Sequence, residues 1–90
     1  MPDDMVVRLM WLDMYLYENR KYPRIRKVIL QDYNNENTTQ MTMNTLIADM
    51  DRLKSLGAGI EKRGREGWFS RKLAFTGNFK EFDLEARRKK

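Results

Sequence analysis

Apolar residues recur every three or four positions along the first half of this chain, the spacing that places side chains on one face of an α-helix. The first such stripe consists of Met5, Leu9, Leu12 and Leu16. It predicts a helix over residues 5–19. Asp3 or Asp4 would cap this helix, because a carboxylate accepts hydrogen bonds from the free amides of the first turn and suits the helix dipole.

The same helix carries a second set of apolar side chains on another face: Val7, Trp11 and Met14. A surface helix normally buries a single stripe, so two stripes indicate that both sides are covered. Trp and Met are enriched at protein interfaces, and we therefore expect a symmetric homodimer through this face. The alternative is that residues 75–84 fold back, with Phe75, Phe79 or Phe82 covering it.

Two further helices follow from the same spacing. Pro23 suits the first turn of a second helix, where its missing N–H does no harm, and we expect this helix to end near Tyr33. It would bury Ile25, Val28 and Ile29. The polar run 34–39 is typical of a loop.

The third helix is predicted over residues 42–56. Thr42 or Thr39 would cap its start, and Gly57 suits a left-handed residue just after its end. Its buried stripe would consist of Leu46, Met50 and Leu53.

The pattern then changes to that of two short strands, residues 58–63 and 68–73. Between them lies Gly64-Arg65-Glu66-Gly67, a turn bracketed by glycines that is typical of a β-hairpin. Neighbouring strand residues point to opposite sides. We therefore expect one of Trp68 and Phe69 in the core and the other exposed.

Together these elements predict a mainly α fold with a small β-hairpin (α+β). Three helices followed by a two-stranded wing is the order of a winged helix-turn-helix. We assign residues 1–74 to this domain and 75–90 to a C-terminal extension with a basic tail. The extension gives mixed signals: Phe79, Phe82 and Leu84 indicate packing, and its last residues are expected to fray.

Composition excludes several function classes. The 90 residues include no cysteine and no histidine, so there is no disulfide framework, no thiolate metal site and no imidazole proton shuttle. The chain also lacks a glycine-rich phosphate loop, a signal peptide and an apolar run near the roughly 18 residues of a membrane span. We expect a cytoplasmic, nucleoid-associated protein that is not an enzyme, with no metal, cofactor, membrane partner or small-molecule substrate.

Charge is distributed unevenly around the net value of +5. Residues 1–19 hold one basic and four acidic side chains, whereas residues 20–72 hold twelve basic and six acidic ones. The last four residues, Arg87 to Lys90, are all basic. This pattern suits a polyanion such as DNA, and the alternative is a solubilising surface with a basic tail.

Several segments resemble one known family. Residues 41–53, Met-Thr-Met-Asn-Thr-Leu-Ile-Ala-Asp-Met-Asp-Arg-Leu, lie without a gap on a third-helix pattern, and residues 56–60 are similar to a Leu-Gly-Ala-Pro-Ile step into a wing. Gly67-Trp68-Phe69 is similar to a Gly-Tyr-Tyr strand. Residues 8–12 resemble a first helix, and Tyr22-Pro23 resembles its connection to the second helix. These patterns are those of the N-terminal winged helix-turn-helix domain of WYL-domain transcriptional regulators, relatives of the DeoR-type domain.

The resemblance implies a domain that binds double-stranded DNA in transcriptional control. Two arginines of the family pattern, which are expected to reach DNA, are Asn44 and Ala48 here. The loop before the third helix is about five residues longer than a tight turn. No sensor domain follows in these 90 residues, so we expect a fragment or a stand-alone domain. A protein-interaction or dimerisation module that has lost DNA binding is the alternative function.

In a winged helix the third helix lies in the major groove, with its N-terminal half against base edges. Asn44 would read adenine through two hydrogen bonds, or is a solvated helix position. Met43 and Ile47 would either contact thymine methyl groups or extend the core. Around the helix start, Thr39, Gln40 and Thr42 suit a phosphate, although capping alone also explains them.

Basic residues outside the third helix complete the predicted DNA contact. In the wing, Lys62, Arg63 and Arg65 would reach the backbone or the minor groove, or form a solvated hairpin tip. Further phosphate contacts would come from Arg24, Arg26, Lys27, Arg71 and Lys72.

Overall fold

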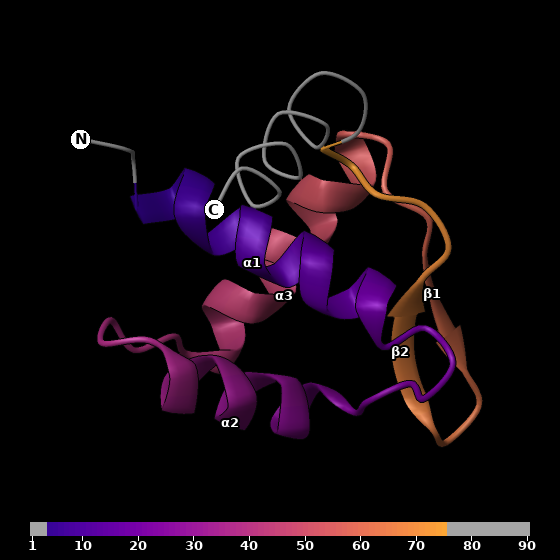
Figure 1. Ribbon diagram of the computed structural model, residues 1–90, viewed down its shortest axis with the longest axis horizontal. Helices are drawn as coiled ribbons and strands as arrows, with labels where there is room; N and C mark the ends of the chain where they lie inside the picture. Colours follow the sequence, from indigo (N-terminus) through magenta and orange to yellow (C-terminus); the bar gives the residue numbers. More distant parts are fainter. Residues whose placement is uncertain (1–3, 76–90) are drawn as a thin grey trace, which may run out of the picture.

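The computed structural model describes residues 4–75 and contains three helices followed by a hairpin (Figure 1). The helices are α1 (Asp4–Glu18), α2 (Arg26–Glu36) and α3 (Met43–Ser55). Strands β1 (Ile60–Arg63) and β2 (Gly67–Ser70) pair in antiparallel fashion, with Lys62 opposite Trp68. The predicted α+β fold, three helices and a two-stranded wing, is confirmed.

Some predicted features fall outside the described residues. They are the cap at Asp3, the side chain of Asp4, the aromatic residues Phe79 and Phe82, and the basic end Arg87 to Lys90. Within the described residues, no helix combines the length and the apolar character needed to cross a bilayer.

The core lies between α1, α2 and α3 and is closed at one end by the hairpin (Figure 1). The predicted stripe of α3, Leu46, Met50 and Leu53, is buried. In α1 the stripe is buried from Leu9 onward, whereas Met5 is exposed. The buried contact therefore begins beside Arg8, where α1 meets Asp49 of α3.

The second helix differs from the prediction at both ends: it continues to Glu36, into the polar run that we expected to be a loop, and it starts later than expected. Pro23 lies in an extended link, and α2 begins at Arg26 with Ile25 as its N-cap residue. The link is held by β2, because the N–H of Trp68 donates to the carbonyl of Arg24 at 2.7 Å and the N–H of Arg24 donates back at 3.2 Å. This pairing keeps the backbone extended before α2, and the side chain of Ile25, which we expected in the core, is exposed.

Gly67 makes that pairing possible. Its φ of +124° is in the left-handed region, and a Cβ added there would lie 2.1 Å from the carbonyl carbon of Arg24. Only glycine allows so close a backbone approach. At the other end of the hairpin, Gly57 has a φ of +105° just after α3, which confirms its predicted role as the helix stop.

Two buried carboxylates tie distant segments together. Asp49 of α3 is fully buried and pairs with Arg8 of α1 and with Arg52 in the next turn of α3. Asp13 of α1 accepts hydrogen bonds from the backbone N–H groups of Ala74 and Phe75. A buried charge needs such partners, so these contacts fix α3 and the segment after the hairpin on α1.

Candidate nucleic-acid interface

The start of α3 is held by its own cap and by α2. Thr42 is the N-cap residue, and its hydroxyl accepts from the N–H of Thr45 at 3.2 Å, which confirms the cap. Asn34 of α2 accepts from the N–H of Met41 at 2.7 Å and donates to its carbonyl at 3.2 Å. The long loop before α3 is therefore fixed at its end.

The three polar residues predicted near this helix start differ in their contacts. Thr42 lies at the first turn of α3, as expected. Gln40 is exposed and donates to the carbonyl of Asn34. Thr39 is exposed and borders a small hollow shared with Val7 and Arg8 of α1.

The outward side of α3 carries a stripe of exposed residues. Asn44, Ile47, Asp51 and Lys54 are all exposed. Their spacing of three, four and three residues places them on one side of the helix, away from the buried Leu46 and Met50. We call this set the α3 stripe. Met43 is partly buried and packs against the core, which favours the core interpretation of that residue.

At one end the α3 stripe meets the hairpin. The ring of Trp68 lies 5.3 Å from the Nζ of Lys54 and 5.6 Å from the Cζ of Arg26. Lys62 is paired with Trp68 across the sheet, so its side chain is on the same face of the hairpin. Cations from α2 and α3 therefore contact this aromatic ring, and Lys62 of β1 lies beside it on the same face of the hairpin. We call Arg26, Lys54 and Lys62 the inner cation cluster.

The cations of the wing do not all face the same way. Arg63 follows Lys62 and lies on the opposite face of the hairpin, where its Cζ is 4.8 Å from the ring of Phe69. Arg71 covers the same ring at 5.3 Å. Arg65 is exposed in the turn between the strands. Of the three predicted wing contacts, Lys62 is thus the one on the side of Trp68.

The adjacent aromatic residues of β2 are both covered. Phe69 is buried beneath the two arginines, and Trp68 is partly buried against the core. The expectation that one of them would be in the core is confirmed by Phe69, but the other is not exposed, because Arg26, Lys54 and the core cover part of Trp68.

Two basic residues near the start of α2 differ in their surroundings. Lys27 is exposed in the first turn of α2, next to Arg26. Arg24 donates from its Nη1 to the carbonyl of Tyr22 at 2.7 Å, and it is close enough to Tyr15 to affect the ionisation of that phenol. The side chain of Arg24 therefore lies beside α1, next to Tyr15.

Tyr15 has a perturbed phenol. Its hydroxyl donates to Asp32 at 2.6 Å. Burial and the nearby carboxylate raise the pKa of Tyr15, and Arg24 opposes this rise only in part. The contact joins α1 to α2 and holds the phenol in its protonated form.

The second apolar face of α1 borders a hollow of about 530 Å³. Val7, Trp11 and Met14 line it, together with the acidic Glu18 and Glu36. Trp11 stacks on Tyr15, with ring centroids 4.7 Å apart, and meets Tyr33 edge-on at 5.0 Å. Phe75 packs against the core and is not among the residues that line the hollow.

Sequence reasoning missed Lys54. A signal was available, because Lys54 lies seven residues after Ile47 and therefore on the same side of α3. Its approach to Trp68 depends on the tertiary position of the hairpin.

Comparison of this chain with known protein families, with curated proteins and with solved structures finds no match.

Proposed function

We propose that this protein is a double-stranded DNA-binding domain of transcriptional control, related to the winged helix-turn-helix of WYL-domain and DeoR-type regulators. The α3 stripe would enter the major groove, and the inner cation cluster would hold the adjacent phosphates. The observation that carries the proposal is the contact of Arg26 and Lys54 with the ring of Trp68, with Lys62 on the same face of the hairpin.

The supporting argument is electrostatic and geometric. Cations from three separate elements gather at the end of an exposed helix face, where they can neutralise phosphates on both sides of a groove. The ring of Trp68 holds two of them by cation–π contact, so less side-chain freedom is lost when they bind. Asn44 lies toward the start of α3 on the same stripe, where a side-chain amide can pair with an adenine edge.

Asp51 works against this contact. It lies within the α3 stripe and is exposed, and a carboxylate repels phosphates. Together with the exposed Ile25 and Ile47, it favours the second candidate function, in which this surface binds a protein instead of DNA.

A salt titration separates the two functions. Binding of a fluorescent random-sequence duplex is measured by anisotropy, from low to physiological salt. A DNA-binding domain shows a linear fall of log affinity with log salt concentration, and each neutralised phosphate contributes a slope of about 0.9. Substitution of Lys62 and Lys54 by Gln should lower this slope by about two. Absence of binding at low salt would reject the DNA proposal and favour the protein-interaction module.

We also propose that the protein forms a homodimer through the hollow beside α1. Val7 is exposed there, and Trp11 and Met14, residue types enriched at interfaces, line the hollow beside the polar Glu18 and Glu36. A symmetric dimer would present two α3 stripes to two half-sites. Light scattering at micromolar concentration tests this: the wild type should be dimeric and Val7→Glu monomeric, and a monomeric wild type contradicts it.

A further inference from the structure

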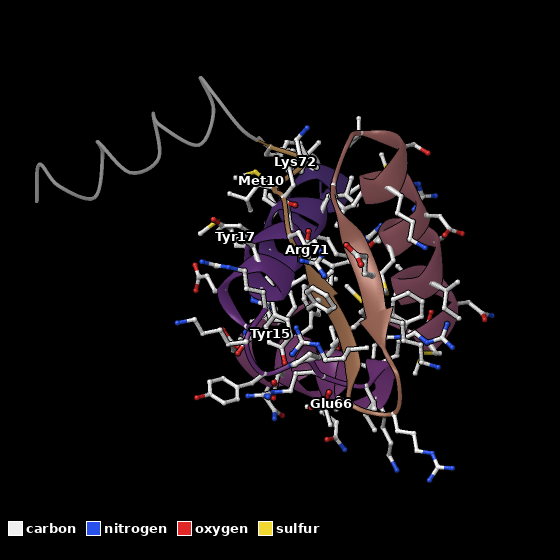
Figure 2. All side chains as sticks on the ribbon, turned by 90° about the vertical axis from the view of Figure 1, so that its right-hand side faces the viewer. Met10, Tyr15, Tyr17, Glu66, Arg71 and Lys72 are labelled. Atoms are coloured by element: carbon white, nitrogen blue, oxygen red, sulfur yellow. The ribbon has the colours of Figure 1, made fainter. Side chains whose placement is uncertain are left out.

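The outer face of the hairpin carries a second group of cations, which the proposed contact of α3 does not use. Arg20, Lys21, Arg63 and Arg71 line a hollow of about 430 Å³, together with the buried ring of Phe69. We call these four residues the outer cation cluster. They come from the turn after α1, from β1 and from the residue just after β2. Arg71 lies on the side of the hairpin that faces the viewer in Figure 2.

Three of these guanidinium groups are held in place. Arg63 and Arg71 rest on Phe69, at 4.8 and 5.3 Å from the ring centroid. Arg20 lies 4.1 Å from the ring of Tyr17, and it donates to the carbonyl of that residue at 2.8 Å. Long side chains that are already ordered lose less freedom when they bind a ligand. The guanidinium groups that line the hollow are therefore already positioned to bind an anion.

Its charge is not balanced by the surrounding residues. Glu61 forms an ion pair with Arg71. Among the described residues, no other acidic side chain is paired with the outer cation cluster, so four positive charges stand against one negative charge. Like charges at short range repel one another, and an anion between them removes this repulsion. Guanidinium groups bind phosphate oxygens in a two-point geometry.

We infer that the outer cation cluster is a second binding site for nucleic-acid phosphates, separate from the surface formed by α3. Trp68 and Phe69 are adjacent in β2 and present their rings to opposite faces of the hairpin. The inner and outer clusters therefore point away from each other. In Figure 2 the hairpin lies toward the viewer, with α1 on its left and α3 on its right.

This arrangement determines which phosphates the outer site meets. In Figure 2 α3 lies to the right of the hairpin and α1 to its left, and Arg20 and Lys21 follow α1 in the sequence. The outer site would therefore bind a second segment of nucleic acid. That segment is either another duplex or a bent continuation of the first one. The inference rests on the proposed function, since it takes DNA as the ligand.

Two matched double variants test it. Arg63→Gln with Arg71→Gln removes the two cations that contact the ring of Phe69, and Arg26→Gln with Lys54→Gln removes the two that contact the ring of Trp68. Each pair lowers the net charge by two, and circular dichroism and thermal melting check that both proteins fold. The first assay measures affinity for a free duplex of about 15 base pairs, and for one of about 40 base pairs, by anisotropy. The second measures capture of a fluorescent duplex by protein bound to a duplex on beads.

We expect the outer variant to bind the short duplex within about twofold of the wild type and to lose about tenfold in capture of the second duplex, since each lost phosphate contact weakens binding. If capture is low for all proteins but the outer variant binds the long duplex about tenfold more weakly, the site serves a bent continuation. If the outer variant matches the wild type in both assays, the inference is overturned. A dimer with one DNA-binding surface per protomer could also capture a second duplex, but that capture would be unchanged in the outer variant.

Failure of the proposed function gives a different result. In that case the inner variant binds the short duplex as the wild type does, whatever the outer variant does. The two assays therefore judge the α3 surface and the outer cluster independently.

Discussion

The buried carboxylate of Asp13 in α1 accepts a hydrogen bond of 2.9 Å from the backbone N–H of Ala74, which lies beyond the hairpin. Its other oxygen accepts from the next amide at 3.0 Å. A single side chain of the first helix therefore fixes the chain where it leaves the wing. Because β2 also packs on α1, this contact helps to hold the hairpin in its position relative to α3.

Substitution of Asp13 should therefore reduce stability. Asp13→Asn replaces one acceptor by a donor that faces a backbone N–H, and leaving a buried donor unsatisfied costs about 1–3 kcal/mol. Urea unfolding followed by circular dichroism measures the loss. Asp51→Asn, at an exposed position, is the control and should change stability by less than about 0.5 kcal/mol. Equal effects of the two substitutions would contradict a special role for Asp13.

Asp49 should matter more, because it is fully buried between two arginines. Asp49→Ala leaves Arg8, which is largely buried, without this partner, and we expect a loss of about 3 kcal/mol. The combined replacement Arg8→Met with Asp49→Leu should recover much of this loss, since the charge and its partner are removed together. Chemical denaturation of the single and double variants provides the test, and a double variant no more stable than Asp49→Ala argues against the explanation.

Gly67 and Gly64 form a matched pair in the hairpin. Gly67→Ala places a Cβ against the backbone of Arg24, whereas a Cβ at Gly64 meets no atom within 4 Å. Both residues have positive φ, so both substitutions incur a strain of about 1–2 kcal/mol. Gly67→Ala should cost at least about 2 kcal/mol more, because the link before α2 must move. Similar thermal midpoints for the two variants would show that the close approach is unimportant.

Asp51 offers a test of the α3 stripe by gain of binding. Asp51→Asn removes a negative charge from the surface proposed to face DNA, and duplex affinity at low salt should rise about threefold. The increase should shrink as salt screens the charge. Glu36→Gln, which removes a charge beside the hollow of α1, is the control and should have a smaller effect when light scattering gives both variants the same oligomeric state. Equal gains for both would indicate a general effect of net charge.

The raised pKa of Tyr15 predicts how the stability of the folded protein changes at alkaline pH. Burial and Asp32 raise the pKa of Tyr15 in the folded protein, so the unfolded chain, with a pKa near 10, loses this proton first. The stabilisation is fully present below pH of about 10 and is lost as the pH rises toward the folded pKa. Urea unfolding at rising pH measures this loss. Tyr15→Phe should remove this part of the pH dependence, and an unchanged alkaline loss in that variant would assign it to another group.

The sequence by itself determined the order of the elements and most of the helical core. The buried stripe of Leu46, Met50 and Leu53 follows from local periodicity, which can be read from the sequence. The helix stop at Gly57 follows from a backbone conformation that favours glycine, and this too is a local property. The cap at Thr42 is equally local, because its partner is three residues away.

Only the tertiary structure decided where α2 begins and how the cations are grouped. Pro23 has the local properties of a first-turn residue, but pairing of Arg24 with Trp68 keeps this segment extended. Lys62 and Arg63 are neighbours in the sequence, and strand alternation sends them to Trp68 on one face and Phe69 on the other. The alternation is local, but which face meets α2 and α3 and which meets the turn after α1 depends on contacts between residues far apart in the chain, whose energies no local pattern contains.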